Sequence, residues 1–159
     1  MNQTLILILM MFLTACSSTG KQEGHTHDNG HEHSKFTKHL AKSVLLVTEK
    51  GLFSVEMSIP GERIKVGLNT FDLIIHNRKD KDVTGADIIV TPWMPDPKMN
   101  HGVFSKPLVV EKGRGLYTVD DVMLVMSGHW EFRINIKWGD TVTTEDNVVF
   151  DFPDVIVED

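Results

Sequence analysis

A chain of 159 residues is long enough to fold as one domain around a hydrophobic core of ordinary size. Its formal net charge of −6 at neutral pH disfavours nucleic acid as a partner, because nucleic-acid binding depends on Lys and Arg that neutralise phosphates. The same acidic balance disfavours attachment to anionic lipid through a basic patch.

The first residues have the pattern of a bacterial lipoprotein signal. An apolar run over residues 5–13 leads into Thr14-Ala15-Cys16. This run is too short for a transmembrane helix, which needs about 20 residues, and small residues before a cysteine are typical of a cleavage site. We therefore expect residues 1–15 to be a cleaved lipoprotein signal peptide and Cys16 to carry the lipid. Because the first four residues lack Lys and Arg, an uncleaved anchor with an incidental cysteine is the alternative.

A lipidated Cys16 would fix both the compartment and the chemistry. It predicts a protein of the cell envelope, anchored to a membrane and facing the periplasm or the exterior. Ser17 follows the cysteine where a retention signal would have aspartate, which favours the outer membrane in a Gram-negative cell. Since Cys16 is the single cysteine, its lipidation would leave no thiol and would exclude disulfides, thiol redox chemistry and a blue-copper centre.

Residues 16–42 are expected to form a lipid-anchored, His-rich flexible tether. The part from Ser17 to Ser34 has no apolar residue to bury, so we expect it to be disordered without a ligand. Its imidazoles alternate with carboxylates, a donor set that suits Zn(II) or another divalent ion. We interpret the tract as a site of metal capture, and the alternative is a solubilising linker. The histidines are His25, His27, His31 and His33.

The chain after the tether reads as β structure, with one ambiguous segment before it. The apolar spacing of Phe36–Val47 predicts a short helix, although Val44–Val47 equally fits the start of a strand. From Gly51 on, apolar and polar residues alternate. Phe53, Val55, Met57 and Ile59 fall on one face of their strand, as do Phe71, Leu73 and Ile75 of the next.

Further strands are expected at residues 83–91, 106–111, 115–119, 122–126, 130–138 and 141–152. A charged hairpin loop is predicted at residues 77–82, and Glu145-Asp146 is predicted to lie solvated at a turn. Trp130, Phe132, Ile134 and Ile136 share a face that we expect to be core. About seven short strands at hairpin spacing predict an all-β, antiparallel, immunoglobulin-like β-sandwich for residues 43–159.

The segment Pro92–Gly102 interrupts the β pattern with three prolines, which oppose both helix and ladder pairing. It carries Met94, Met99 and His101. Thioether and imidazole are donors that soft Cu(I) accepts, and a stiff loop lowers the entropic cost of holding them ready. These three residues are candidate copper ligands, and packing against the end of the sandwich is the alternative.

A second group of donors lies at residues 123–130. Met123 and Met126 would fall on opposite faces of a strand, so at most one of them packs in the core, and the sequence leaves open which. Met126 is the next candidate ligand after the loop residues. His129 follows a glycine turn and is expected to be exposed.

The order of these motifs resembles the YtkA-like domain family, which includes FixH-type proteins. The matching segments are Met94-Pro95 through His101-Gly102, Gly115-Leu116-Tyr117, and Met126 to Trp130. The resemblance covers about residues 50–150 and implies a small extracytoplasmic β-sandwich, found in settings of heavy-metal efflux or cytochrome oxidase assembly. The chain departs from the family in two ways: Asp96-Pro97-Lys98 lengthens the spacing between the methionines, and the lipoprotein signal replaces the transmembrane helix of FixH-type members.

The sequence contains no nucleophile elbow, phosphate loop or His-Glu-x-x-His motif, so we do not expect an enzyme. We expect a lipid-anchored metal-binding protein, a copper buffer or chaperone linked to metal efflux or cuproenzyme assembly. Its partners would be the membrane, through the N-terminal lipid, and a metal-efflux or oxidase-assembly complex. The alternative is a non-metal accessory module that docks on a membrane protein complex through the edge of its sandwich.

Overall fold

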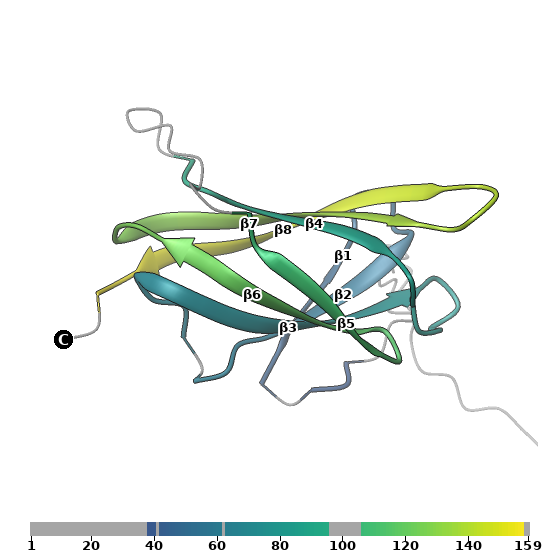
Figure 1. Cartoon of the computed structure of the whole chain (residues 1–159), viewed down its shortest axis with the longest axis horizontal. Helices are drawn as coiled ribbons and strands as arrows, with labels where there is room; N and C mark the ends of the chain where they lie inside the picture. The colour runs from purple at the N-terminus through teal and green to yellow at the C-terminus, as the bar shows by residue number, and fades with distance from the viewer. Residues whose placement is uncertain (1–37, 41, 62, 96–105, 158–159) are drawn as a thin grey trace, which may run out of the picture. The chain divides into compact units, whose positions relative to one another are not determined.

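The part of the chain that the structure describes forms eight strands, arranged in two antiparallel sheets (Figure 1). The computed structural model describes residues 38–157 apart from 41, 62 and 96–105, all within one unit, His33–Asp159. The strands are β1 (Val44–Val47), β2 (Phe53–Ser58), β3 (Gly67–Asn77), β4 (Asp87–Trp93), β5 (Leu108–Gly113), β6 (Leu116–Leu124), β7 (Gly128–Trp138) and β8 (Thr144–Val155). The prediction of an all-β antiparallel sandwich is confirmed, with eight strands instead of about seven.

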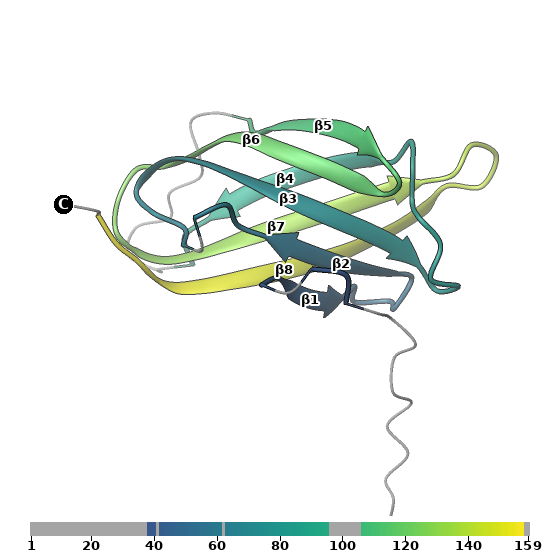
Figure 2. The same cartoon turned by 90° about the horizontal axis from the view of Figure 1, so that it is seen from below.

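Among the described strands, the chain crosses between the two sheets three times, from β3 to β4, from β4 to β5 and from β6 to β7. One sheet has the order β1-β2-β3-β6-β5, which Figure 2 shows across its face, and the other has the order β4-β7-β8. Without the extra edge strand β1, this is the arrangement of a constant-type immunoglobulin sandwich, with four strands in one sheet and three in the other. Among the described residues no helix is long and apolar enough to cross a membrane.

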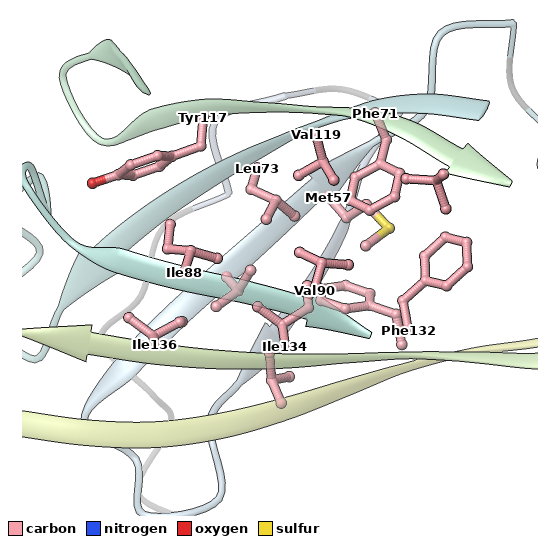
Figure 3. Close-up of a cluster of buried hydrophobic side chains, with 14 of the residues drawn as sticks. Met57, Phe71, Leu73, Ile88, Val90, Tyr117, Val119, Phe132, Ile134 and Ile136 are labelled. Atoms are coloured by element: carbon pink, nitrogen blue, oxygen red, sulfur yellow. The ribbon is translucent and has the colours of Figure 1, made fainter. Parts of the chain in front are cut away.

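The core forms where the inner faces of the two sheets meet (Figure 3). Alternation explains it, because successive side chains of a strand point to opposite faces. The predicted inward face of β3 is confirmed, since Phe71, Leu73 and Ile75 are fully buried. The predicted face of β7 is also buried, and Phe132 stacks on Phe71 across the sheets with ring centroids 5.2 Å apart.

The helix predicted for Phe36–Val47 is wrong over its described part, and the alternative is right. Val44–Val47 form β1, which pairs antiparallel with β2 from Val44↔Met57 to Val47↔Ser54. A turn closed by Gly51 N–H donating to Thr48 O, at 2.8 Å, returns the chain into β2. Hairpin pairing with an existing sheet therefore overrides a weak helical spacing in a segment rich in β-branched residues.

Three other details go beyond or differ from the prediction. The chain does pair antiparallel across the loop at residues 77–82, with Val83 N–H donating to Ile75 O at 2.9 Å, but this pairing is short and the chain then crosses to the other sheet, where β4 begins. The strand predicted at 122–126 is the end of β6, which continues past Asp121 although that residue has a left-handed φ of 59°. Pro92 pairs within β4 opposite Phe132, which is tolerated because β4 is an edge strand.

Asp146 is not solvated as predicted but has no exposed surface. Its carboxylate accepts hydrogen bonds from Thr48 Oγ1 at 2.6 Å and from the main-chain N–H groups of Lys50, Leu52 and Asn147. Burial alone would raise the pKa of Asp146, but these donors outweigh it and hold the pKa below its usual value. The residue thus fastens the β1–β2 turn, in one sheet, to β8 in the other.

Candidate metal sites

Met94 lies at the end of β4, where the chain leaves the three-stranded sheet. Its side chain is 3% exposed and belongs to the hydrophobic core. Its methyl carbon lies 3.4 Å from the place where a Cβ on Gly128 would stand. Met94 therefore packs at the start of β7, next to the β6–β7 turn of residues 125–127, which contains Met126. In this conformation its thioether faces the protein interior, as the packing alternative expected.

Met126 is half-buried and packs against the same core, whereas Met123 is half-buried without joining it. This answers the question that the sequence left open. One of the two packs against the core, as expected, but β6 ends at Leu124, so Met126 lies in the turn and not on a strand face. Its carbonyl oxygen accepts a hydrogen bond from Trp130 Nε1 at 3.0 Å, which anchors the turn to β7.

The other predicted site residues lie outside the described residues. They are Met99 and His101 of the proline-rich segment, the tract histidines His25, His27, His31 and His33, and the lipidation site Cys16. Of the predicted ligands, the structure thus places Met94 and Met126, at the same end of the sandwich.

A different donor cluster, which sequence reasoning missed, lies at the opposite end of β3. The rings of His39 and His76 stack with centroids 4.4 Å apart, at an interplanar angle of 25°. One ligand atom from each ring and one carboxylate oxygen of Asp80 lie within 4.8 Å of one another. His76 occupies an outward position of β3, next to inward Ile75, so alternation predicts it exposed. It is 6% exposed instead.

The burial of His76 follows from Glu56, which occupies the outer face of the neighbouring strand β2 and is 1% exposed. Glu56 accepts hydrogen bonds from the main-chain N–H groups of His39, at 2.7 Å, and Leu40, and from Ser43 Oγ. Burial alone would raise the pKa of Glu56, but the Ser43 and main-chain hydrogen bonds and the nearby His39 ring hold it below its usual value. The segment before β1 is thereby fastened over the outer face of β2 and β3.

A third cluster lies on the outer face of the three-stranded sheet and contains His129, Glu131 and Asp151, whose ligand atoms also lie within 4.8 Å of one another. His129 is exposed, as predicted, and its Nε2 contacts Asp151. This cluster offers one imidazole and two carboxylates. It is therefore a poorer match to a transition-metal site than the paired imidazoles of His39 and His76.

Comparison with protein families places this geometry in context. The family model described as YtkA-like matches residues 49–135, more than half of the chain. The chain belongs to the YtkA-like family. The predicted resemblance to that family is thus confirmed. Comparisons with curated proteins and with solved structures give no match.

The YtkA-like match covers both methionine segments and the strands between them. It runs from the β1–β2 turn into β7, so it includes Met94, Met126 and also His76. His39 lies before the matched residues, and β8 lies after them. The pair of His39 and His76 therefore joins a residue of the matched region, His76, to a residue of the segment before it, His39.

Proposed function

We propose that this YtkA-like protein is a lipid-anchored, extracytoplasmic metal-binding protein, a copper buffer or chaperone linked to metal efflux or cuproenzyme assembly. It acts by binding and not by catalysis. One observation carries the proposal: the Met94 methyl lies beside Gly128, so two thioether-bearing segments meet at one end of the sandwich. The chain leaves Met94 directly into the segment that holds Met99 and His101.

The donor chemistry supports a soft ion. Thioethers and imidazole suit Cu(I) better than they suit Mg(II) or Ca(II). Because Met94 is buried, its sulfur would reach an ion from the core of the sandwich. The sulfur of Met126 would reach the ion from the half-buried turn. Thioethers carry no proton to lose, so binding should persist at mildly acidic pH. His101 would add one donor that protonates near its unperturbed pKa of about 6.5.

The N-terminal region completes the proposal. Lipid on Cys16 would hold the protein to a membrane, facing the periplasm or the exterior, with the outer membrane favoured in a Gram-negative cell. His25, His27, His31 and His33 would capture Zn(II) or another divalent ion, or capture copper and pass it to the domain. A metal-efflux or oxidase-assembly complex is the partner that this role implies.

A Cu(I) competition titration tests the site. We would use the chain from residue 16 with Cys16→Ser and with asparagine at His25, His27, His31 and His33, because the thiolate and the tract would themselves bind copper. Cu(I) is titrated against a chromophoric chelator under reducing conditions. Replacement of Met99 or Met126 by leucine removes a sulfur while nearly conserving volume. Each change should weaken Cu(I) binding at least tenfold, about 1.4 kcal/mol. His101→Ala should do the same.

Met123→Leu is the matched control, because Met123 is half-buried like Met126 but does not pack against the core. It should leave the affinity unchanged. Met57→Ala, in the core, should lower stability and leave the affinity nearly unchanged. If Met94→Leu, Met99→Leu and Met126→Leu combined bind Cu(I) like the parent, the methionines are packing residues.

That result would favour the second function, a non-metal accessory module that docks on a membrane protein complex. The observation in its favour is the edge strand β5, which pairs with β6 alone among the described strands and leaves Leu108 54% exposed. An open strand edge of this kind can accept a strand from a partner.

A further inference from the structure

The fold assembles a second set of metal donors from parts of the chain that are distant in sequence. His76 comes from the end of β3, Asp80 from the turn that follows, and His39 from the segment before β1. The His76 side chain is 7% exposed and the His39 side chain 38% exposed, so one ring is fixed within the protein and the other caps it. The two rings meet only in the folded protein.

Each ring also has a carboxylate that orients it. Nδ1 of His39 lies 3.4 Å from Oε2 of Glu56, and Nε2 of His76 lies 3.1 Å from Oδ1 of Asp82. Histidines that bind metal ions commonly pair one ring nitrogen with a carboxylate, which sets the ring's orientation and tautomer and raises its basicity as a ligand. An imidazole has two nitrogens, so each ring has another one to offer to an ion.

We infer that His39, His76 and Asp80 bind a divalent transition-metal ion of the Zn(II) or Cu(II) class, with Glu56 and Asp82 as positioning residues. Two imidazoles and a carboxylate are a common protein donor set for Zn(II), whereas the thioether end of the sandwich suits Cu(I). This inference does not depend on the proposed copper function. It assigns a different ion to a different end of the same domain.

The spacing of the donors fits an ion after a small contraction. With metal–ligand distances of about 2.0–2.1 Å, a tetrahedral zinc shell separates its donors by about 3.3 Å. The donors here lie within 4.8 Å of one another, so the longest separation must shorten by at most about 1.5 Å. His39 and Asp80 are both exposed and can supply this movement by side-chain rotation, while His76 stays in place.

An ion in this site would be linked to folding, unlike an ion on the His-rich tract. The tract histidines are neighbours in sequence, so they are close together in the unfolded chain as well. His39 and His76 become neighbours only when the segment before β1 covers the outer face of β3. A ligand that binds only the folded state raises the unfolding temperature. Thermal stabilisation therefore reports on the folded site.

The experiment uses the chain from residue 16 with Cys16→Ser and with asparagine at all four tract histidines, so that neither the thiol nor the tract contributes. Zn(II) is titrated against a fluorescent chelator, and thermal unfolding is followed with and without Zn(II). The parent should bind Zn(II) and unfold at a higher temperature when Zn(II) is present. His39→Gln and His76→Gln should each weaken binding at least tenfold and abolish the rise in unfolding temperature.

His129→Gln is the matched control, since it removes an exposed histidine that also neighbours carboxylates, and it should change neither readout. His39→Gln keeps the test decisive if His76→Gln fails to fold, because His39 is the exposed ring. Zn(II) affinity that is unchanged in His39→Gln, or a parent without thermal stabilisation by Zn(II), would overturn the inference and leave the stacked histidines as a packing feature. Cu(I) binding by the methionine variants is measured in its own titration. A negative result at one site therefore does not decide the proposal for the other.

Discussion

Replacing Asp146 by asparagine should destabilise the protein strongly, although the two side chains have nearly the same shape. The carboxylate has no exposed surface and accepts hydrogen bonds from Thr48 Oγ1 and from the main-chain N–H groups of Lys50, Leu52 and Asn147. An asparagine side chain keeps one oxygen and places an NH₂ group where the second oxygen was. Donors that faced that oxygen then meet another donor.

The size of the effect follows from the number of donors left unpaired. If the remaining oxygen serves two of the four donors, two others lose their acceptor. A buried donor without a partner costs about 1–3 kcal/mol, and hydrogen bonds to a charged acceptor lie at the upper end of the scale. We expect Asp146→Asn to lower the free energy of unfolding by about 3 kcal/mol near neutral pH.

Urea unfolding followed by tryptophan fluorescence measures this change as a shift in midpoint at unchanged slope. The pH dependence gives a second readout. The folded-state pKa of Asp146 lies below its usual value, so its contribution is complete above the unfolded pKa of about 3.9. That contribution is lost as the pH falls through the folded-state value. The difference between parent and variant should therefore shrink in acid below about pH 4.

Asp154→Asn is the matched control, because Asp154 lies on the same strand but is exposed. It should change the free energy of unfolding by no more than about 0.5 kcal/mol. A loss of less than about 1 kcal/mol for Asp146→Asn, or a loss that does not depend on pH in acid, would refute the reasoning that the charged carboxylate holds the β1–β2 turn.

Two further predictions concern the core and the N-terminus. Trp130 is 1% exposed, so Trp130→Ala should cost about 3–5 kcal/mol in urea unfolding, and a loss below about 1 kcal/mol would contradict its place in the core. The protein should incorporate labelled fatty acid in a bacterial host, and Cys16→Ser should abolish the label; unchanged labelling of the variant would rule out the anchor.

The sequence predicts what alternation can encode, which is the inner face of each strand. Phe71, Leu73 and Ile75 are buried as expected, and so is the Trp130 face of β7. Strict alternation says nothing about what covers the other side of a sheet. His76 sits in an outward position, yet it is buried because a segment from before β1 lies over it.

The candidate sites were only partly predictable for a related reason. Met94 and Met126 could be singled out because their segments carry recognisable local motifs, but their packing depends on the turn at Gly128. The pair His39 and His76 had no local signal, since the residues are far apart in sequence and meet because Glu56 holds the His39 segment over β2 and β3. Asp146 looked like a turn residue, because three of its four donors, from Thr48, Lys50 and Leu52, come from a distant part of the chain.

The hydrogen bonds of Glu56 also define where the folded unit can be cut. A protease that cleaved between Lys42 and Ser43 would leave all eight strands intact but would remove the N–H donors of His39 and Leu40. A buried carboxylate would then keep Ser43 Oγ as a donor but lose both main-chain partners. Stability should fall with the removal of a few residues that belong to no strand. In limited proteolysis, the resistant fragment should therefore begin before His39, ahead of the first strand.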